Sequence, residues 1–462
     1  MAIAIGGSES QMDVRYGETL RPGERFVCES LQHGNEEGIG IERTFAAMDR
    51  LGEKRFAARA AEEPRCQPTP MNSSAQRPDA PATQRPSEGL TRSEFLRAGA
   101  CGLGALALGS ALPSRAAESA SNPESPVSKP MPSSPVSCDL RPFVQWIISE
   151  YEPSIRLPGP SGRYARSPGQ KTPELYGTCD MACILYTLGL LRPTEKERRE
   201  WAGEFQSYQD PQTGWLLERS PSHGPVHNTA FALAAMNLLG LVPERPVVMG
   251  PEYADPAAML ETIDWRKEVY PGSHKGVGSA AIHALAPGVG SKKWFDAYFA
   301  HCDSLLDPNN GMLGRDKPAG GDFDQVGGTF HYLFTYASFN RKMAYPEKRI
   351  DAVLRLQQPD GYWHAQNHLW LSFDAIYMMT RGLRDTPHRF EEVRAAVRRT
   401  VKAVERDFYS VEARRTAYNG KVGVHSVTAA LCFAAEAQQF LGRDEIITDD
   451  PLRLHIDRSP FT

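Results

Sequence analysis

Long hydrophobic runs and blocks of like charge are both missing from this sequence. No apolar run reaches the roughly 18 residues that a membrane-spanning helix needs, so we expect no stable membrane insertion of the mature protein. The formal net charge is −4 over 462 residues, with acidic and basic side chains interspersed. Because no basic stripe is present to neutralise a phosphate backbone, a nucleic-acid partner is not expected.

Cysteine is scarce as well, with eight in the chain and no spacing typical of a metal site. Cys179 and Cys183 are four residues apart in an apolar stretch, which is typical of small buried side chains. A zinc site usually has a second pair at similar spacing, and none follows. The sequence therefore predicts no metal and no other cofactor.

An export signal is present between residues 91 and 117. Arg92 and Arg97 form a basic start, Ala98–Leu112 is an apolar run too short to span a membrane, and Ser114–Ala116 has the small-x-small pattern of a cleavage site. Residues 91–97 resemble a twin-arginine signal, but Ser93 stands where the second arginine belongs. The general secretory route therefore stays open, and we expect a periplasmic or extracellular protein.

This signal lies deep in the chain, although export signals act at an N-terminus. Met71 gives an ordinary signal region over residues 71–117, so residues 1–70 are interpreted as a disordered upstream extension from a misplaced start. Residues 118–137 are rich in Ser and Pro and predict a disordered linker. A folded domain is then expected over 138–442, followed by a C-terminal tail over 443–462.

Two kinds of helical pattern alternate through the predicted domain. Amphipathic, charge-rich patterns predict outer helices, and they cover residues 139–151, 194–208, 255–267, 291–306, 345–357 and 387–408. Patterns that are apolar on nearly all sides predict buried inner helices, over residues 175–190, 226–240, 274–286, 325–339, 370–382 and 421–440.

Similar Gly/Pro turns recur between outer and inner helices. Asp210–Trp215, Asp307–Met312 and Gln358–Trp363 each combine proline, glycine and a bulky apolar residue, and Tyr270–Gly272 is a weaker version. Turns repeating every 40–60 residues indicate a repeat architecture. The prediction is an all-α fold of six helical hairpins closed into an α/α toroid, or (α/α)6 barrel; the alternative is an open helical solenoid.

The residues Gln357–Trp363 look like the Gln-x-x-x-Gly-x-Trp repeat of triterpene cyclases, and Tyr208–Trp215 is a looser copy. The chain thus resembles the terpenoid cyclase and protein prenyltransferase toroid superfamily. In that resemblance, Asp322–Gln325 partly matches the acid motif of squalene-type cyclases, which would place the protonating residue at Asp324. No Asp-x-Cys is present, which disfavours the zinc site of protein prenyltransferases. Six-hairpin glycosidases and α/α-toroid polysaccharide lyases share the shape, so the fold does not select a function.

Titratable and aromatic residues collect where the inner helices begin, and in a toroid these ends face the same mouth. Asp324 or Asp374 is the expected general acid, and His227 or His425 the expected base or orienting partner. The alternative is that these residues are helix caps and core hydrogen bonds. The candidate catalytic residues are Asp180, His227, Asp324, Asp374 and His425, and the candidate substrate-binding residues are Tyr176, His274, His364, His368, Trp363 and Trp370.

Such a mouth suits carbohydrate, because aromatic faces stack on sugar rings and carboxylates share acid and base work. We expect a monomeric glycoside hydrolase or polysaccharide lyase with a small-molecule or oligosaccharide ligand. The alternatives are a terpenoid-cyclase-like enzyme and a non-catalytic carbohydrate-binding toroid.

Overall fold

In the computed structural model, the described residues are 3–6, 13–16, 135–218, 223–314, 321–364, 368–415 and 422–462. The predicted start at Met71, the predicted export signal over 71–117 and residues 118–134 of the predicted linker lie outside them. Within the predicted upstream extension, β1 (Ile3–Gly6) and β2 (Asp13–Tyr16) pair in antiparallel fashion.

Helices dominate the described residues, which confirms the all-α prediction. Two further short strands, β3 (Cys138–Asp139) and β4 (Ile446–Ile447), pair in parallel. Just before β3, the backbone N–H of Val136 donates to the Glu445 carboxylate at 3.0 Å. Ordered packing therefore begins slightly before residue 138.

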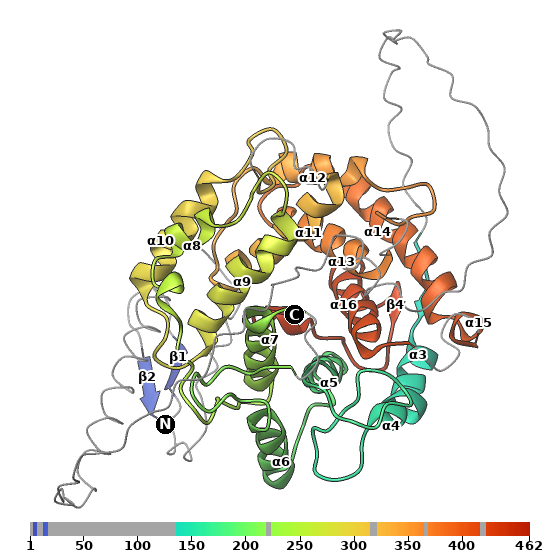
Figure 1. The fold of residues 1–462 in the computed structure, drawn as a ribbon. Helices are drawn as coiled ribbons and strands as arrows, with labels where there is room; N and C mark the ends of the chain where they lie inside the picture. The colour runs from blue at the N-terminus through green and yellow to red at the C-terminus, as the bar shows by residue number, and fades with distance from the viewer. Residues whose placement is uncertain are drawn as a thin grey trace, which may run out of the picture. The chain divides into compact units, whose positions relative to one another are not determined.

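The inner helices are largely buried, as expected from their apolar patterns. In α7, for instance, every residue from His227 to Met236 is buried. Each inner helix contacts the next inner helix along the chain, and α16 contacts α5; Figure 1 shows them following one another. Their bounds are α5 (Leu175–Thr187), α7 (Pro225–Leu238), α9 (Val269–Leu285), α11 (Gly321–Ser338), α13 (His368–Gly382) and α16 (Val424–Leu441).

The remaining helices are amphipathic and bury only one stripe. In α14 that stripe includes Val393, Val397, Val401 and Val404, a spacing that places them on one face. These helices are α3 (Arg141–Trp146) with its π-helical extension η1 (Ile147–Tyr151), α4 (Glu152–Ile155), α6 (Glu195–Gln206), α8 (Pro256–Glu261), α10 (Lys292–Ser304), α12 (Pro346–Arg355), α14 (Phe390–Val404) with η3 (Glu405–Tyr409), and α15 (Val411–Ala413). A 3-10 turn, η2 (Pro251–Tyr253), precedes α8.

Two helix bounds differ from the sequence expectation. The third inner helix begins at Val269, because Pro271 is tolerated in a first helical turn, where its missing N–H is not needed. The expected turn at Tyr270–Gly272 therefore belongs to α9. The preceding helix α8 ends at Glu261, beyond which the buried Trp265 folds back and donates from Nε1 to the Leu260 carbonyl at 2.9 Å.

The repeated turns have the backbone that their glycines predict. Gly214, Gly311 and Gly361 have φ of 71°, 67° and 97°, a region that strains other residues. At Gly214 an added Cβ would lie 2.0 Å from the Pro246 carbonyl oxygen. The three turns are therefore built alike, and glycine is required at each.

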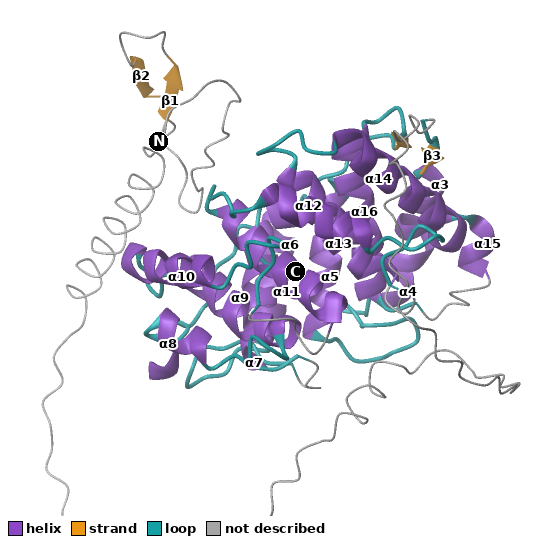
Figure 2. Ribbon diagram, turned by 90° about the horizontal axis from the view of Figure 1, so that it is seen from above, coloured by secondary structure: helices purple, strands orange, loops and turns teal. Residues whose placement is uncertain are grey.

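Residues 443–462 continue the compact unit instead of forming a separate tail. The backbone N–H of Arg453 donates to the Thr187 carbonyl at the end of α5. Past the 3-10 turn η5 (His455–Asp457), the Ser459 hydroxyl donates to the Ala234 carbonyl of α7 at 3.0 Å. Both views place the C-terminus among the inner helices (Figures 1 and 2), so this segment fills space between them.

Candidate functional site

Two tyrosines and five histidines, from five inner helices and the residues next to them, form one cluster. The Tyr176 hydroxyl of α5 lies 2.8 Å from Nδ1 of His223 and 2.5 Å from Nδ1 of His227. Glycine at 224 and Pro225 at the first position of α7 set the chain so that both imidazoles stack beside the phenol ring. We call the joined set of Tyr176, His223, His227, Tyr270, His274, His331 and His425 the Tyr–His cluster.

Further rings extend the cluster from α7 to α9 and α11. The ring centroids of His223 and His227 are 4.6 Å apart, and His274 lies 4.8 Å from His227. Tyr270, one turn before His274 on α9, lies 5.1 Å from His274 and 5.4 Å from His331. Of the predicted site residues, the structure brings His227, His274 and Tyr176 close together. Tyr270, which the prediction left out, lies beside them.

Burial keeps these imidazoles neutral at pH 7. Desolvation, with smaller contributions from neighbouring imidazoles at His223 and His274, lowers the pKa of His223 to about 4, that of His274 to about 3 and that of His331 to about 4. The pKa of His227 lies well below its usual value, because burial disfavours its charged form and His274 and His223 are close by. Neutral imidazoles offer proton acceptors, so the cluster is equipped for proton transfer.

His425 of the Tyr–His cluster pairs with the buried Asp180. Nδ1 of His425 lies 3.0 Å from Oδ1 of Asp180. Asp180 is fully buried, whereas the His425 side chain is 29% exposed. The Trp370 ring lies 4.5 Å from the His425 ring, and the Tyr176 ring 5.9 Å from it. The aspartate thus orients an imidazole whose other edge reaches solvent.

Asp374 lies near Tyr270. Burial raises the pKa of Asp374 well above its usual value, because it disfavours the charged carboxylate. Burial and this carboxyl raise the pKa of Tyr270 to about 12. A Cβ added to Gly327 would meet the Tyr270 ring at 2.9 Å and Oδ2 of Asp374 at 3.6 Å. Glycine at 327 lets the two groups share the surface of α11.

Asp324 has a structural role that the sequence left open. Its two carboxylate oxygens accept the backbone N–H groups of Val269 and Tyr270 at 3.0 and 3.1 Å. Asp324 therefore caps the start of α9 from the neighbouring helix α11. Burial nevertheless raises the pKa of its carboxyl.

The other predicted binding residues are dispersed. Trp363 is buried and donates from Nε1 to the Val353 carbonyl, so its ring packs on α12 and not at an entrance. His364 is half-buried with its ring 4.7 Å from Phe323, which in turn lies 6.0 Å from Tyr270. His368 is the first residue of α13, but its side chain lies outside the described residues.

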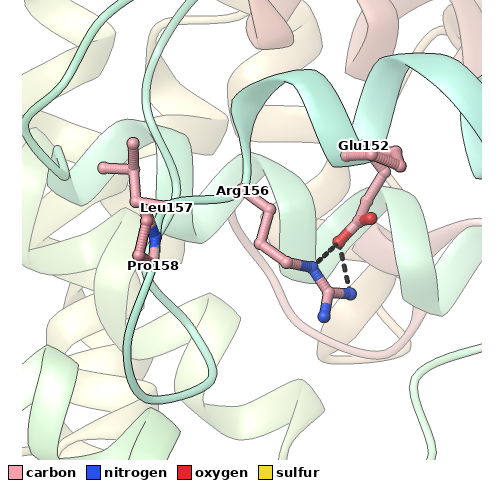
Figure 3. A pocket seen from close by; sticks show the side chains of 5 residues that line it. Glu152, Arg156, Leu157 and Pro158 are labelled. Atoms are coloured by element: carbon pink, nitrogen blue, oxygen red, sulfur yellow. Dashed lines mark hydrogen bonds and ion pairs between the residues drawn. The ribbon is translucent and has the colours of Figure 1, made fainter.

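A hollow of about 440 Å³ lies elsewhere, against α4. Figure 3 shows Arg156 pairing with Glu152 beside Leu157 and Pro158, and the Nε–Oε1 distance is 2.7 Å. None of these residues belongs to the Tyr–His cluster.

Among the residues that the structure describes, no three or more His, Cys, Asp and Glu side chains are grouped to hold a metal ion. Within the same ranges, no helix combines the length and apolarity that crossing a bilayer requires.

The cluster residues that the prediction left out, Tyr270, His223 and His331, are far apart in the sequence, and only Tyr270 shows a local spacing that could have identified it. Tyr270 and His274 are four residues apart, the spacing that places two side chains on one helical face. His223 lies two residues before α7, and His331 lies in the middle of α11. No protein-family model, no curated protein and no solved structure matched the chain in three comparisons.

Proposed function

We propose that residues 135–462 form an α/α toroid of six helical hairpins with the Tyr–His cluster at its mouth. The support is the sequence of contacts from α5 through α16 and back to α5. A closed arrangement of this kind gathers the first turns of helices that are distant in sequence. Tyr176 of α5, His227 of α7 and His425 of α16 occupy such positions, and His274 lies in the second turn of α9.

The proposed function is that of an exported enzyme acting on carbohydrate. The observation that carries it is the Tyr176 hydroxyl shared by the Nδ1 atoms of two neutral imidazoles. The hydroxyl can donate its proton to one Nδ1 atom and accept an N–H from the other, so the three groups can relay a proton to and from a substrate. The half-buried ring of Trp370 beside His425 offers a surface for stacking a sugar.

A glycoside hydrolase is the candidate favoured by Asp374. Burial favours its protonated carboxyl, which is the form that a general acid needs for the leaving oxygen. The same raised pKa makes Asp374 a weak acid, which suits glycoside cleavage better than protonation of an alkene in terpenoid cyclisation. A polysaccharide lyase would instead rely on Tyr176 and the imidazoles.

The test is a screen of the purified full chain against a panel of polysaccharides. Hydrolysis is followed by new reducing ends, and elimination by the ultraviolet absorption of an unsaturated product. We expect Tyr176→Phe to lower kcat by roughly 100-fold or more, since acid–base groups contribute about 10²–10⁴-fold.

Tyr164→Phe is the matched control, because Tyr164 is a buried tyrosine whose hydroxyl bonds Glu152 away from the cluster. Asp374→Asn separates the two chemistries, since it abolishes turnover only if Asp374 is the acid. No cleavage of any polysaccharide, or equal activity of Tyr176→Phe and wild type, contradicts the proposed function.

A further inference from the structure

Arg166 is held at the edge of the Tyr–His cluster. It lies in the loop between α4 and α5, where its backbone carbonyl accepts the N–H of Val424, the first residue of α16. Its guanidinium carbon lies 4.9 Å from the centroid of the Tyr176 ring. Two separate contacts therefore fix the residue between α5 and α16, beside the shared hydroxyl.

The guanidinium of Arg166 keeps its hydrogen-bond donors available. Within the described ranges it makes no ion pair and no side-chain hydrogen bond, and the side chain is half-buried. Stacking on an aromatic ring uses the flat face of a guanidinium and leaves its N–H edge free. Burial raises the pKa of Glu174, and the positive charge of Arg166 partly offsets that rise. The two side chains nevertheless form no ion pair.

Arg166 brings a positive charge beside the shared hydroxyl, where the nearby carboxylates already have partners: Asp180 pairs with His425, and Glu218 accepts the backbone N–H of Tyr176. His223 and His227, which bond the Tyr176 hydroxyl, are neutral at pH 7 because burial lowers their pKa. Arginine stays protonated at any working pH. A ligand entering beside Tyr176 thus meets a fixed positive charge with a free, planar set of donors.

We propose that Arg166 binds an anionic group on the sugar, a carboxylate or a sulfate ester, so that the site selects acidic carbohydrate. A guanidinium edge matches such a group with two parallel N–H···O bonds. The choice of a sugar rests on the proposed function, whereas the choice of an anion rests on Arg166 itself.

The experiment measures binding to the full chain by calorimetry or NMR titration. The probes are glucuronate, a sulfated hexose, glucose and inorganic sulfate, each added to wild type, Arg166→Gln and Arg341→Gln. Arg341 is the control, because its guanidinium also lies over a ring, 4.6 Å from the Phe299 centroid, and pairs with Asp303, which is not a residue of the cluster.

We expect Arg166→Gln to weaken binding of the acidic sugar by roughly 10- to 100-fold, the value of a charged hydrogen-bonded pair. Glucose binding should not change, and Arg341→Gln should behave as wild type. The preferred acidic probe tells carboxylate from sulfate. Equal affinity for glucose and both acidic sugars overturns the anion proposal while leaving the proposed function standing.

Binding of inorganic sulfate that depends on Arg166, without binding of any sugar, supports the anion site and contradicts carbohydrate as the ligand. Absence of binding by every probe overturns the anion proposal. A melting temperature of Arg166→Gln close to that of wild type confirms that any lost binding is local.

Discussion

Crowding of imidazoles governs the chemistry of individual residues in this protein. His227 lies within 5 Å of both His223 and His274 between ring centroids. A proton on any one of them would be both poorly solvated and repelled by protons on the others. The same arrangement that keeps these imidazoles neutral therefore makes the folded protein sensitive to acid.

We predict that stability falls as the pH drops from 6.5 towards 4. In the unfolded chain histidine takes up a proton near pH 6.5, whereas His331 in the folded chain has a pKa of about 4. The unfolded state thus binds more protons in this window, and the free energy of unfolding rises with pH. Below pH 4 the folded state is protonated too, and this dependence ends.

For His331 the full effect is roughly 3 kcal/mol, since one pKa unit corresponds to about 1.4 kcal/mol. Urea unfolding at several pH values measures it, and His331→Gln should show a shallower slope between pH 4 and 6.5 than wild type. Identical slopes for the two proteins would show that the histidine is not held neutral by the fold.

At the scale of elements, helix starts are secured by carboxylates and hydroxyls in different ways. Thr194 and Glu197 form a capping box within α6, and Asp255 caps α8 through the N–H groups of Ala257 and Ala258. Asp324 differs, because it caps α9 from α11 and so joins two inner helices. Loss of this cap removes a contact between elements as well as a local one.

We predict that Asp324→Ala lowers the free energy of unfolding by about 2 kcal/mol, the upper end for a lost cap. Asp255→Ala, which affects a short and partly exposed helix, should cost about 1 kcal/mol or less. Chemical denaturation of both variants gives the comparison. If Asp324→Ala abolishes turnover at unchanged stability, Asp324 is the general acid of the sequence-based hypothesis and not chiefly a cap.

At the scale of the folded unit, residues 443–462 link the two ends of the inner helices. Asp457 pairs with Arg381 near the end of α13, and Arg381 also pairs with Glu436 of α16 at 2.6 Å. From there the chain reaches Phe461, whose ring lies 4.8 Å from His227 and 6.2 Å from Phe334. The segment therefore supports the Tyr–His cluster from within.

We predict that Phe461→Ala costs about 3–5 kcal/mol of stability, the usual range for a buried phenylalanine, and admits water to His227. The pKa of His227, followed by NMR on histidine-labelled protein, should rise towards 6.5. Phe440→Ala is the control, because this half-buried ring packs on Phe390 away from the cluster. Equal destabilisation by the two variants, with an unchanged His227 pKa, would refute a supporting role for Phe461.

Local pattern determined much of this protein. Inner helices were predicted because their sequences are apolar all round, and most bounds fell within a few residues of the expectation. The turns containing Gly214, Gly311 and Gly361 were predicted because positive φ is itself a local demand on one residue. The same local patterns predicted that Asp, His and Tyr residues lie where the inner helices begin.

Only the tertiary structure decided what those residues meet. The pairing of Asp180 with His425 joins positions 245 residues apart, and no sequence spacing encodes it. The same holds for Asp324 capping α9, for Asp374 beside Tyr270, and for Phe461 against His227. A helix fixes which side chains share its face, but the neighbour of that face depends on how the helices pack, and packing is settled by the whole buried surface at once.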